Sequence, residues 1–214
     1  MSSLTDITSD EVDRKRKFGT FIDLYAGCGG LSLGLMMAGW IGLFAIERDR
    51  HAFETLHHNL IEGLSRYKFK WPSWLPKKRF RIGPFLKKYR KNLEELRGQV
   101  DLLVGGPPCQ GFSMAGKRRK NDPRNRMFRH YIEMVQLIRP SYVLLENVQG
   151  IDVEFQSDTK AGNKRQGKET FAVRIQTALE ELNYRVFVGI VNASEYGVPQ
   201  MRKRYFMIAV AKEQ

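Results

Sequence analysis

The sequence predicts an α/β fold, with a mostly parallel sheet flanked by helices. Apolar segments with strand character alternate along the chain with segments whose apolar residues recur at helical spacing. Two of the strand segments, residues 100–106 and 141–147, are nearly continuous apolar runs. Such runs are typical of strands that are buried on both faces of a parallel sheet.

The predicted elements follow one another in a regular order. The segments predicted as strands are residues 18–25, 41–47, 100–106, 141–147, 185–193 and 204–211. The segments predicted as helices are residues 31–38, 50–60, 127–138 and 169–182. Pro72 and Pro76 predict an irregular segment between the second strand and the third, and residues 152–168 are polar enough to predict a loop. We therefore expect a polar N-terminal extension over residues 1–17, followed by one catalytic domain over residues 18–214.

Positive charge is concentrated in two parts of the chain. Lys and Arg total 36 against 23 Asp and Glu, which gives a net charge of +13. No acidic residue lies between Glu62 and Glu94, and residues 117–129 contain only Asp122. Either run is compatible with a solvated face, but their position beside the motifs described below favours a surface that contacts phosphate.

Composition excludes several classes of protein. A hydrophobic content of 42% excludes a disordered chain, and no apolar run reaches the roughly 18 residues that a membrane span needs. Two cysteines are too few for a disulfide framework, and the four histidines match no metal-binding spacing, so we expect no metal. The N-terminus lacks the apolar core of a signal peptide, which predicts a cytosolic protein.

A glycine-rich loop follows the first predicted strand and opens the first helix. It reads Asp-Leu-Tyr-Ala-Gly-Cys-Gly-Gly from Asp23 to Gly30, and Ser32 stands where a dinucleotide-binding motif would have its third glycine. Glu47 ends the next strand about 20 residues later, where a carboxylate commonly accepts hydrogen bonds from ribose. The loop alone is compatible with a simple tight turn. Together with Glu47 it predicts a site for a nucleoside-containing cofactor.

Cys109 lies in a second motif, Gly-Gly-Pro-Pro-Cys-Gln-Gly-Phe-Ser, between Gly105 and Ser113. Most free cysteines are buried structural residues, and we interpret Cys28 in this way. Cys109 differs because it follows a buried strand and two prolines, which make the turn rigid and direct the side chain outwards. A thiolate at such a position is a strong nucleophile once nearby cations or backbone N–H groups lower its pKa.

Charged side chains also occur at two other strand ends. Glu146 and Asn147 end an apolar strand, where a carboxylate is a candidate acid or a rigid hydrogen-bond partner, with a helix cap or a salt bridge as the alternative. Residues 200–204 precede the last strand, and alternate residues of an extended segment point the same way. Arg202 and Arg204 can therefore face an anion together, or form an ordinary basic edge.

Taken in order, these motifs resemble the cytosine-5 DNA methyltransferases. The resemblance extends from Phe18 to Val210 and rests on FIDLYAGCGGLSLG, the strand end at Glu47, GGPPCQGFS, LLENV and GVPQMRKR. It implies the Rossmann-like fold of methyltransferases that use S-adenosylmethionine, present here without the small recognition domain. The implied reaction is methyl transfer to carbon 5 of a cytosine in double-stranded DNA.

The resemblance also implies a role for each site residue. The residues expected to bind S-adenosylmethionine are Phe21, Asp23, Ala26, Gly27, Gly29, Gly30, Glu47 and Pro107. Cys109 would attack carbon 6 of a flipped cytosine, and Glu146 would pair with its ring nitrogen and amine. The residues expected to contact DNA are Ser113, Lys117, Arg118, Asn147, Arg202 and Arg204, and both arginines would also hold the base during catalysis.

Two features depart from the family pattern near the expected adenine site. The family usually has an acidic residue near the end of its third strand, but residues 63–93 contain none. Arg48 follows Glu47 where the family often has an aromatic residue. The resemblance therefore implies that apolar walls and backbone atoms hold the adenine.

Family members continue past the last motif with a target-recognition region and a final helix that returns to the cofactor site, whereas this sequence ends at Gln214. We consider a catalytic subunit completed by a second chain, a piece of a longer protein, or a degenerate gene product. A restriction-modification setting in the bacterial cytosol, with the protein on nucleoid DNA, is expected. Two alternatives stay open: the same reaction on transfer RNA, and a nucleic-acid-binding module with an inactive site.

Overall fold

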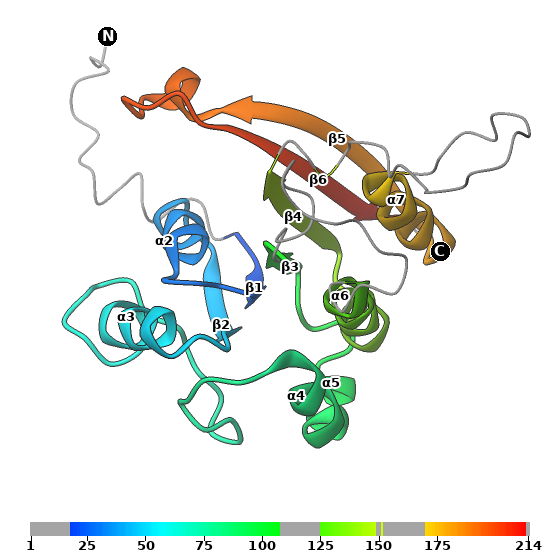
Figure 1. Ribbon diagram of the computed structural model, residues 1–214. Coiled ribbons are helices and arrows are strands. Elements are labelled where there is room, and N and C mark those ends of the chain that lie inside the picture. Colours follow the sequence, from blue (N-terminus) through cyan, green and yellow to red (C-terminus); the bar gives the residue numbers. More distant parts are fainter. Residues whose placement is uncertain (1–17, 108–124, 149–150, 152–169, 213–214) are drawn as a thin grey trace, which may run out of the picture.

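The computed structural model describes residues 18–107, 125–148, 151 and 170–212, and within them six strands form one mixed sheet flanked by helices (Figure 1). The strands are β1 (Thr20–Leu24), β2 (Ile41–Ile46), β3 (Leu102–Gly105), β4 (Tyr142–Val148), β5 (Tyr184–Asn192) and β6 (Lys203–Ala211). All six strands predicted from the sequence are confirmed. The predicted N-terminal extension, residues 1–17, lies outside the described residues.

The strands lie in the order β2-β1-β3-β4-β6-β5. The pairings β1 with β2, β1 with β3 and β3 with β4 are parallel, whereas β6 is antiparallel to both of its neighbours. The sheet is thus less uniformly parallel than the sequence suggested. The reason is the short connection from β5 to β6, because adjacent strands can be parallel only when a long crossover joins them. Figure 1 shows β5 and β6 as a long ribbon that extends past the end of β4.

Six α-helices accompany the sheet in the described ranges, and a short 3-10 helix, η2 (Ala193–Tyr196), follows β5. The α-helices are α2 (Gly30–Met37), α3 (Arg50–Leu60), α4 (Ile82–Lys88), α5 (Arg90–Glu95), α6 (Asn125–Ile138) and α7 (Phe171–Glu181). The four predicted helices are confirmed, and side-chain caps fix two of their starts. Asp49 accepts a hydrogen bond from Ala52 N at 2.9 Å, and Thr170 accepts one from Val173 N at 3.2 Å.

Helices α4 and α5 were not predicted, because the prolines suggested an irregular basic segment. Pro72 and Pro76 do interrupt regular structure, but only before residue 82. Beyond that point Ile82, Phe85 and Leu86 bury one side of a short helix, and both α4 and α5 pack against α6. Burial of these apolar side chains outweighs the unfavourable run of like charges on the exposed side.

Aromatic side chains anchor the basic segment to the edge strand β2. The Phe44 ring lies 5.7 Å from the ring of Trp74 and 6.1 Å from that of Phe85, and all three rings are at least partly buried. The indole of Trp71 donates to Leu75 O at 2.8 Å. The backbone that carries the lysines and arginines of this segment is therefore packed firmly against the sheet.

Candidate functional site

The carboxyl ends of three parallel strands meet at one edge of the sheet. Leu24 of β1 is in register with Gly105 of β3, and Gly105 is in register with Leu145 of β4. The antiparallel β6 brings its amino end to the same edge, where Arg204 is in register with Val148. The motifs that follow β1, β3 and β4 and the motif that precedes β6 thus converge, as expected for a site in an open α/β sheet.

The glycine loop adopts a backbone that needs its glycines. Gly27 has a φ of 57° and Gly29 a φ of 89°, both in the left-handed region. Gly27 N donates to Glu47 Oε2 at 2.9 Å, while Arg48 N and Asp49 N each donate to Glu47 Oε1 at 2.7 Å. Glu47 therefore ties the end of β2 to the loop after β1, a role that the sequence did not reveal.

The loop leaves open space where a cofactor would lie. A Cβ atom added to Gly27 or Gly30 would meet nothing within 4 Å, so the backbone can be approached closely at both. A Cβ on Gly29 would instead lie 2.5 Å from Leu56 Cδ1, so Gly29 serves the packing of the loop against α3. A carboxylate can accept about four hydrogen bonds, so Glu47 can still accept one in addition to the three from backbone N–H groups. Gly27, Gly30 and Glu47 therefore fit S-adenosylmethionine.

Asp23 lies beneath this loop and is 1% exposed. Its carboxylate accepts a short hydrogen bond from the Ser32 hydroxyl in the first turn of α2. Burial raises the pKa of Asp23 to about 7, the Ser32 hydroxyl opposes that rise, and the nearby charge of Glu47 adds to it. The structure thus places Asp23 as a support of the loop, not on its open side.

Phe21 was expected to line the cofactor site, and the structure contradicts this. Its side chain is 0% exposed in the core and packs 5.8 Å from the ring of Phe69. The loop begins four residues later, at Tyr25, which has a φ of 61° and donates to Met127 O at 2.6 Å. Ala26 N donates to Ile46 O at 3.2 Å and holds the loop to β2.

The second motif is held in place by Asn147. This side chain is 4% exposed, and its Nδ2 donates to Pro107 O at 3.0 Å while its Oδ1 accepts from Val148 N at 2.9 Å. Pro107 is itself buried. Asn147 therefore fixes the end of β4 to Pro107, two residues before Cys109 in the sequence. The DNA contact expected for Asn147 stays a prediction.

Glu146 and Arg204 form an ion pair beside Gly106, which follows β3. Arg204 Nε lies 3.0 Å from Glu146 Oε1, and the two side chains are 21% and 30% exposed. A Cβ on Gly106 would lie 3.1 Å from Glu146 Oε2, so a side chain at this position would press on the carboxylate. Arg202 is exposed, and its backbone N donates to Asn192 Oδ1 at 2.9 Å.

Four of the expected site residues, Cys109, Ser113, Lys117 and Arg118, lie outside the described residues. Phe80 is a candidate cofactor-binding residue that the sequence did not reveal. Its backbone N donates to Glu47 O at 2.8 Å, which places a half-buried aromatic residue alongside the end of β2. No sequence signal could have shown this, because Phe80 lies far along the chain in an irregular segment.

Neither a metal-binding cluster nor a membrane-spanning helix is present in the described part of the chain. In it, no group of three or more His, Cys, Asp or Glu side chains could hold a metal ion. None of its helices is long and apolar enough to cross a membrane.

Type II methyltransferases are among the proteins whose sequences are similar to this chain. The chain is 35% identical over 194 residues to the Type II methyltransferase M.DdeI of Desulfomicrobium norvegicum, covering 90% of this chain and 40% of that protein. It is 30% identical over 199 residues to the Type II methyltransferase M.AquIA of a Picosynechococcus species, covering 87% of this chain and 70% of the relative. This chain thus spans less than half the length of M.DdeI.

Solved structures show the same fold. A protein described as a DNA modification methyltransferase encoded within an E. coli prophage superimposes with a TM-score of 0.59 at 29% identity, covering 91% of this chain and 47% of that one. The S. pombe Dnmt2 methyltransferase gives a TM-score of 0.61 at 20% identity, covering 91% and 50%, which supports the fold alone. The family model for C-5 cytosine-specific DNA methylases matches residues 19–214. The chain therefore belongs to the C-5 cytosine-specific DNA methylase family, whose members use S-adenosylmethionine.

Proposed function

We propose that this protein transfers a methyl group from S-adenosylmethionine to carbon 5 of cytosine in double-stranded DNA. The observation that carries the proposal is the ion pair of Glu146 and Arg204 beside Gly106, which precedes Cys109 by three residues in the sequence. A carboxylate, a guanidinium and the start of the nucleophile motif thus lie together, at the same end of the strands as the glycine loop.

On the cofactor side, the chain supplies an open backbone and one carboxylate. Gly27 and Gly30 allow close approach, Glu47 accepts from ribose hydroxyls, and Phe80 supplies apolar surface beside the end of β2. When bound there, S-adenosylmethionine supplies an electrophilic methyl group on a sulfonium. Asp23 and Ser32 hold the loop from below, because their buried hydrogen bond joins β1 to α2.

On the base side, carbon 5 of cytosine must first be made nucleophilic. The Cys109 thiolate adds to carbon 6, and Glu146, held by Arg204, hydrogen-bonds ring nitrogen 3 and the exocyclic amine as charge develops on the ring. After carbon 5 is methylated, a base removes its proton and the thiolate is expelled. A stacked base cannot reach this edge, so the cytosine must flip out of the duplex.

Membership of the family does not favour the two alternatives, methylation of transfer RNA and a nucleic-acid-binding module with an inactive site. The Type II relatives favour a restriction-modification setting. We extend the proposal to action on bacterial DNA in the cytosol.

We also propose that a further polypeptide segment, carrying the target-recognition region, completes the active enzyme. It would be supplied either by a second chain or by a longer form of this one. The chain covers only 40% of M.DdeI. Within the described residues, β5 and β6 carry exposed apolar side chains on neighbouring positions: Ile208 is in register with Phe187. Phe187 is 53% exposed and Ile208 is 44% exposed.

Methyl transfer to mixed-sequence duplex DNA tests the proposed function, with the protein assayed alone and with the segment that follows the last motif in M.DdeI. We expect 5-methylcytosine in at least one of these reactions, and its loss in the Glu146→Gln variant. Methylation that Glu146→Gln leaves unchanged, or methyl groups on another atom, would contradict the proposal.

A further inference from the structure

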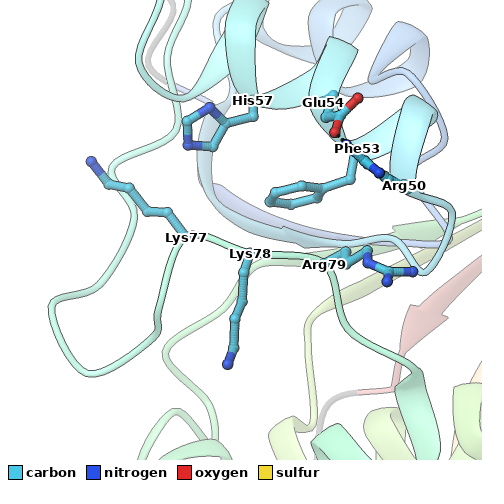
Figure 2. Close-up of a pocket in the computed structure, with 7 residues that line it drawn as sticks. All are labelled: Arg50, Phe53, Glu54, His57, Lys77, Lys78 and Arg79. Carbon is cyan, nitrogen blue, oxygen red and sulfur yellow. Dashed lines mark hydrogen bonds and ion pairs between the residues drawn. The ribbon is translucent and has the colours of Figure 1, made fainter.

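Two hollows on the described surface lie beside α3 and α4, and the second of them includes Phe80 next to the end of β2. One is a cavity of about 500 Å³ between α3 and the segment that follows Pro76 (Figure 2). Its walls carry four cations, one carboxylate, a histidine and an aromatic ring: Arg50, Lys77, Lys78, Arg79, Glu54, His57 and Phe53. Figure 2 shows the Phe53 ring at its centre, with His57 and Lys77 on one side and Arg50 and Arg79 on the other.

A second hollow of about 320 Å³ adjoins the first, because both are lined by Lys78 and Arg79. Figure 2 shows the Lys78 side chain extending away from the Phe53 ring. The second hollow adds Arg81 and Lys88 at its rim, above a base formed by Phe85 and other apolar side chains. We call the two hollows together the basic groove.

Much of the positive charge in the basic groove is uncompensated. Arg50 pairs with Glu54 at 2.8 Å, and Lys77 lies 3.4 Å from Glu62, but both pairs are largely exposed and therefore weak. In the part of the chain that the structure describes, Lys78, Arg79, Arg81 and Lys88 form no ion pair. Carrying these charges on one short stretch is unfavourable in the isolated protein and favourable beside a polyanion.

The basic groove is separate from the strand ends that carry Glu146. It lies beside the end of the outermost strand β2, where Arg79 donates to Arg48 O at 3.3 Å. Strand β4 is three places away in the sheet, about 14 Å at the usual strand spacing. A ligand in the groove would therefore not be the target cytosine.

We propose that the basic groove binds the sugar-phosphate backbone of duplex DNA outside the target site, without regard to sequence. The inference rests on the proposed function only in taking DNA as the polyanion that the protein meets. Two adjoining hollows with shared cations fit a row of phosphates better than one small anion, which would occupy the first hollow alone. The rings of Phe53 and Phe85 are buried (6% and 1% exposed), so neither offers a face on which a base could stack. The half-buried ring of Phe80 has Lys78 Nζ over it, 5.8 Å from the ring centroid.

The salt dependence of binding separates these occupants. Each neutralised phosphate contributes about 0.9 to the slope of log affinity against log salt concentration. We would compare Arg50→Gln/Lys77→Gln, which line only the first hollow, Arg81→Gln/Lys88→Gln, which line only the second, and the combined variant. Fluorescence anisotropy of a labelled mixed-sequence duplex, between about 50 and 200 mM salt, gives the affinity and the slope of each.

The expected result is a slope that becomes shallower by about one to two for each pair, with the two effects adding in the combined variant. Arg185→Gln/Lys212→Gln is the matched control, because it removes two exposed cations at β5, the opposite edge of the sheet. The control should retain the slope of the unchanged protein. Thermal unfolding checks that every variant is folded, as expected because each replacement exchanges an exposed cation for a neutral polar side chain.

Three results would overturn the inference: no binding of the duplex by the unchanged protein, an equal loss in the control, or a loss confined to the first hollow. The last would indicate a site for a small anion. Because anisotropy reports binding and not methyl transfer, a failure here leaves the proposed function intact. Conversely, groove-dependent binding without 5-methylcytosine would contradict the proposed function alone.

Discussion

Arg204 Nε lies 3.0 Å from Glu146 Oε1, although the two residues belong to motifs on different strands. The antiparallel pairing of β6 with β4 makes this contact possible, because it brings the start of one strand to the end of the other. In the proposed reaction Arg204 positions the carboxylate that holds the base. The pair thus connects strand topology to the base side of the site.

Replacing Arg204 with glutamine should slow methyl transfer by about 100-fold, as expected when a donor aligned on developing charge is lost. The Glu146 carboxylate would lose its fixed orientation. Single-turnover transfer of labelled methyl groups to duplex DNA measures the effect. Arg185→Gln, an exposed arginine on β5, is the matched control and should transfer at the normal rate. A normal rate for Arg204→Gln would show that the ion pair has no catalytic part.

Replacing Glu47 with glutamine should weaken S-adenosylmethionine binding about tenfold or more. The glutamine amide cannot accept all three backbone N–H bonds that the carboxylate accepts, so the loop and the ribose contact would both suffer. Isothermal titration calorimetry gives the affinity. Glu62→Gln changes an exposed glutamate in the same way and should leave the affinity unchanged. Equal affinities for both variants would remove Glu47 from the cofactor site.

Two neighbouring glycines should respond differently to alanine. Gly29→Ala should lower the free energy of unfolding by about 2 to 4 kcal/mol, because the added Cβ meets Leu56 and the φ of 89° disfavours a side chain. Gly30→Ala should change stability by less than about 1 kcal/mol, since it has free space at a helix start. It should weaken cofactor binding instead. Urea unfolding and calorimetry would measure the two effects, and similar stabilities for both variants would contradict this assignment.

The sequence predicted the six strands, four helices and the strand ends that carry the site, because apolar runs and glycine loops are local signals. It did not predict α4 and α5, whose apolar face is interrupted by many lysines and arginines. It also assigned Phe21 to the cofactor site, although Phe21 lies inside β1, three residues before its end, and both faces of that strand are buried. The contacts from Asn147 to Pro107 and from Glu47 to Gly27 depend on strand order, which no local pattern encodes.

Stability should depend on the protonation of Asp23. Its pKa is about 7 in the folded protein, above its ordinary value of 3.8, so the folded state binds more protons between these values. Stability should therefore fall as pH rises from about 4 to about 7 and level off above that. Asp23→Asn retains an acceptor for Ser32 but cannot ionise. The fall in the free energy of unfolding that Asp23 causes, at most about 4 kcal/mol, should therefore be missing from the variant. Urea unfolding of both proteins from pH 4 to pH 8 would show it, and parallel pH profiles would contradict the assignment.

The most direct test of the account is the identity of the methylated atom and its dependence on Cys109. Duplex DNA incubated with S-adenosylmethionine and the protein, supplied with its recognition segment, would be hydrolysed and its nucleosides identified by mass spectrometry. The account predicts 5-methylcytosine with the unchanged protein and none with Cys109→Ser, because a serine hydroxyl at neutral pH is a far poorer nucleophile than a thiolate. Methylation retained by Cys109→Ser, or methyl groups found on an exocyclic amine, would contradict it.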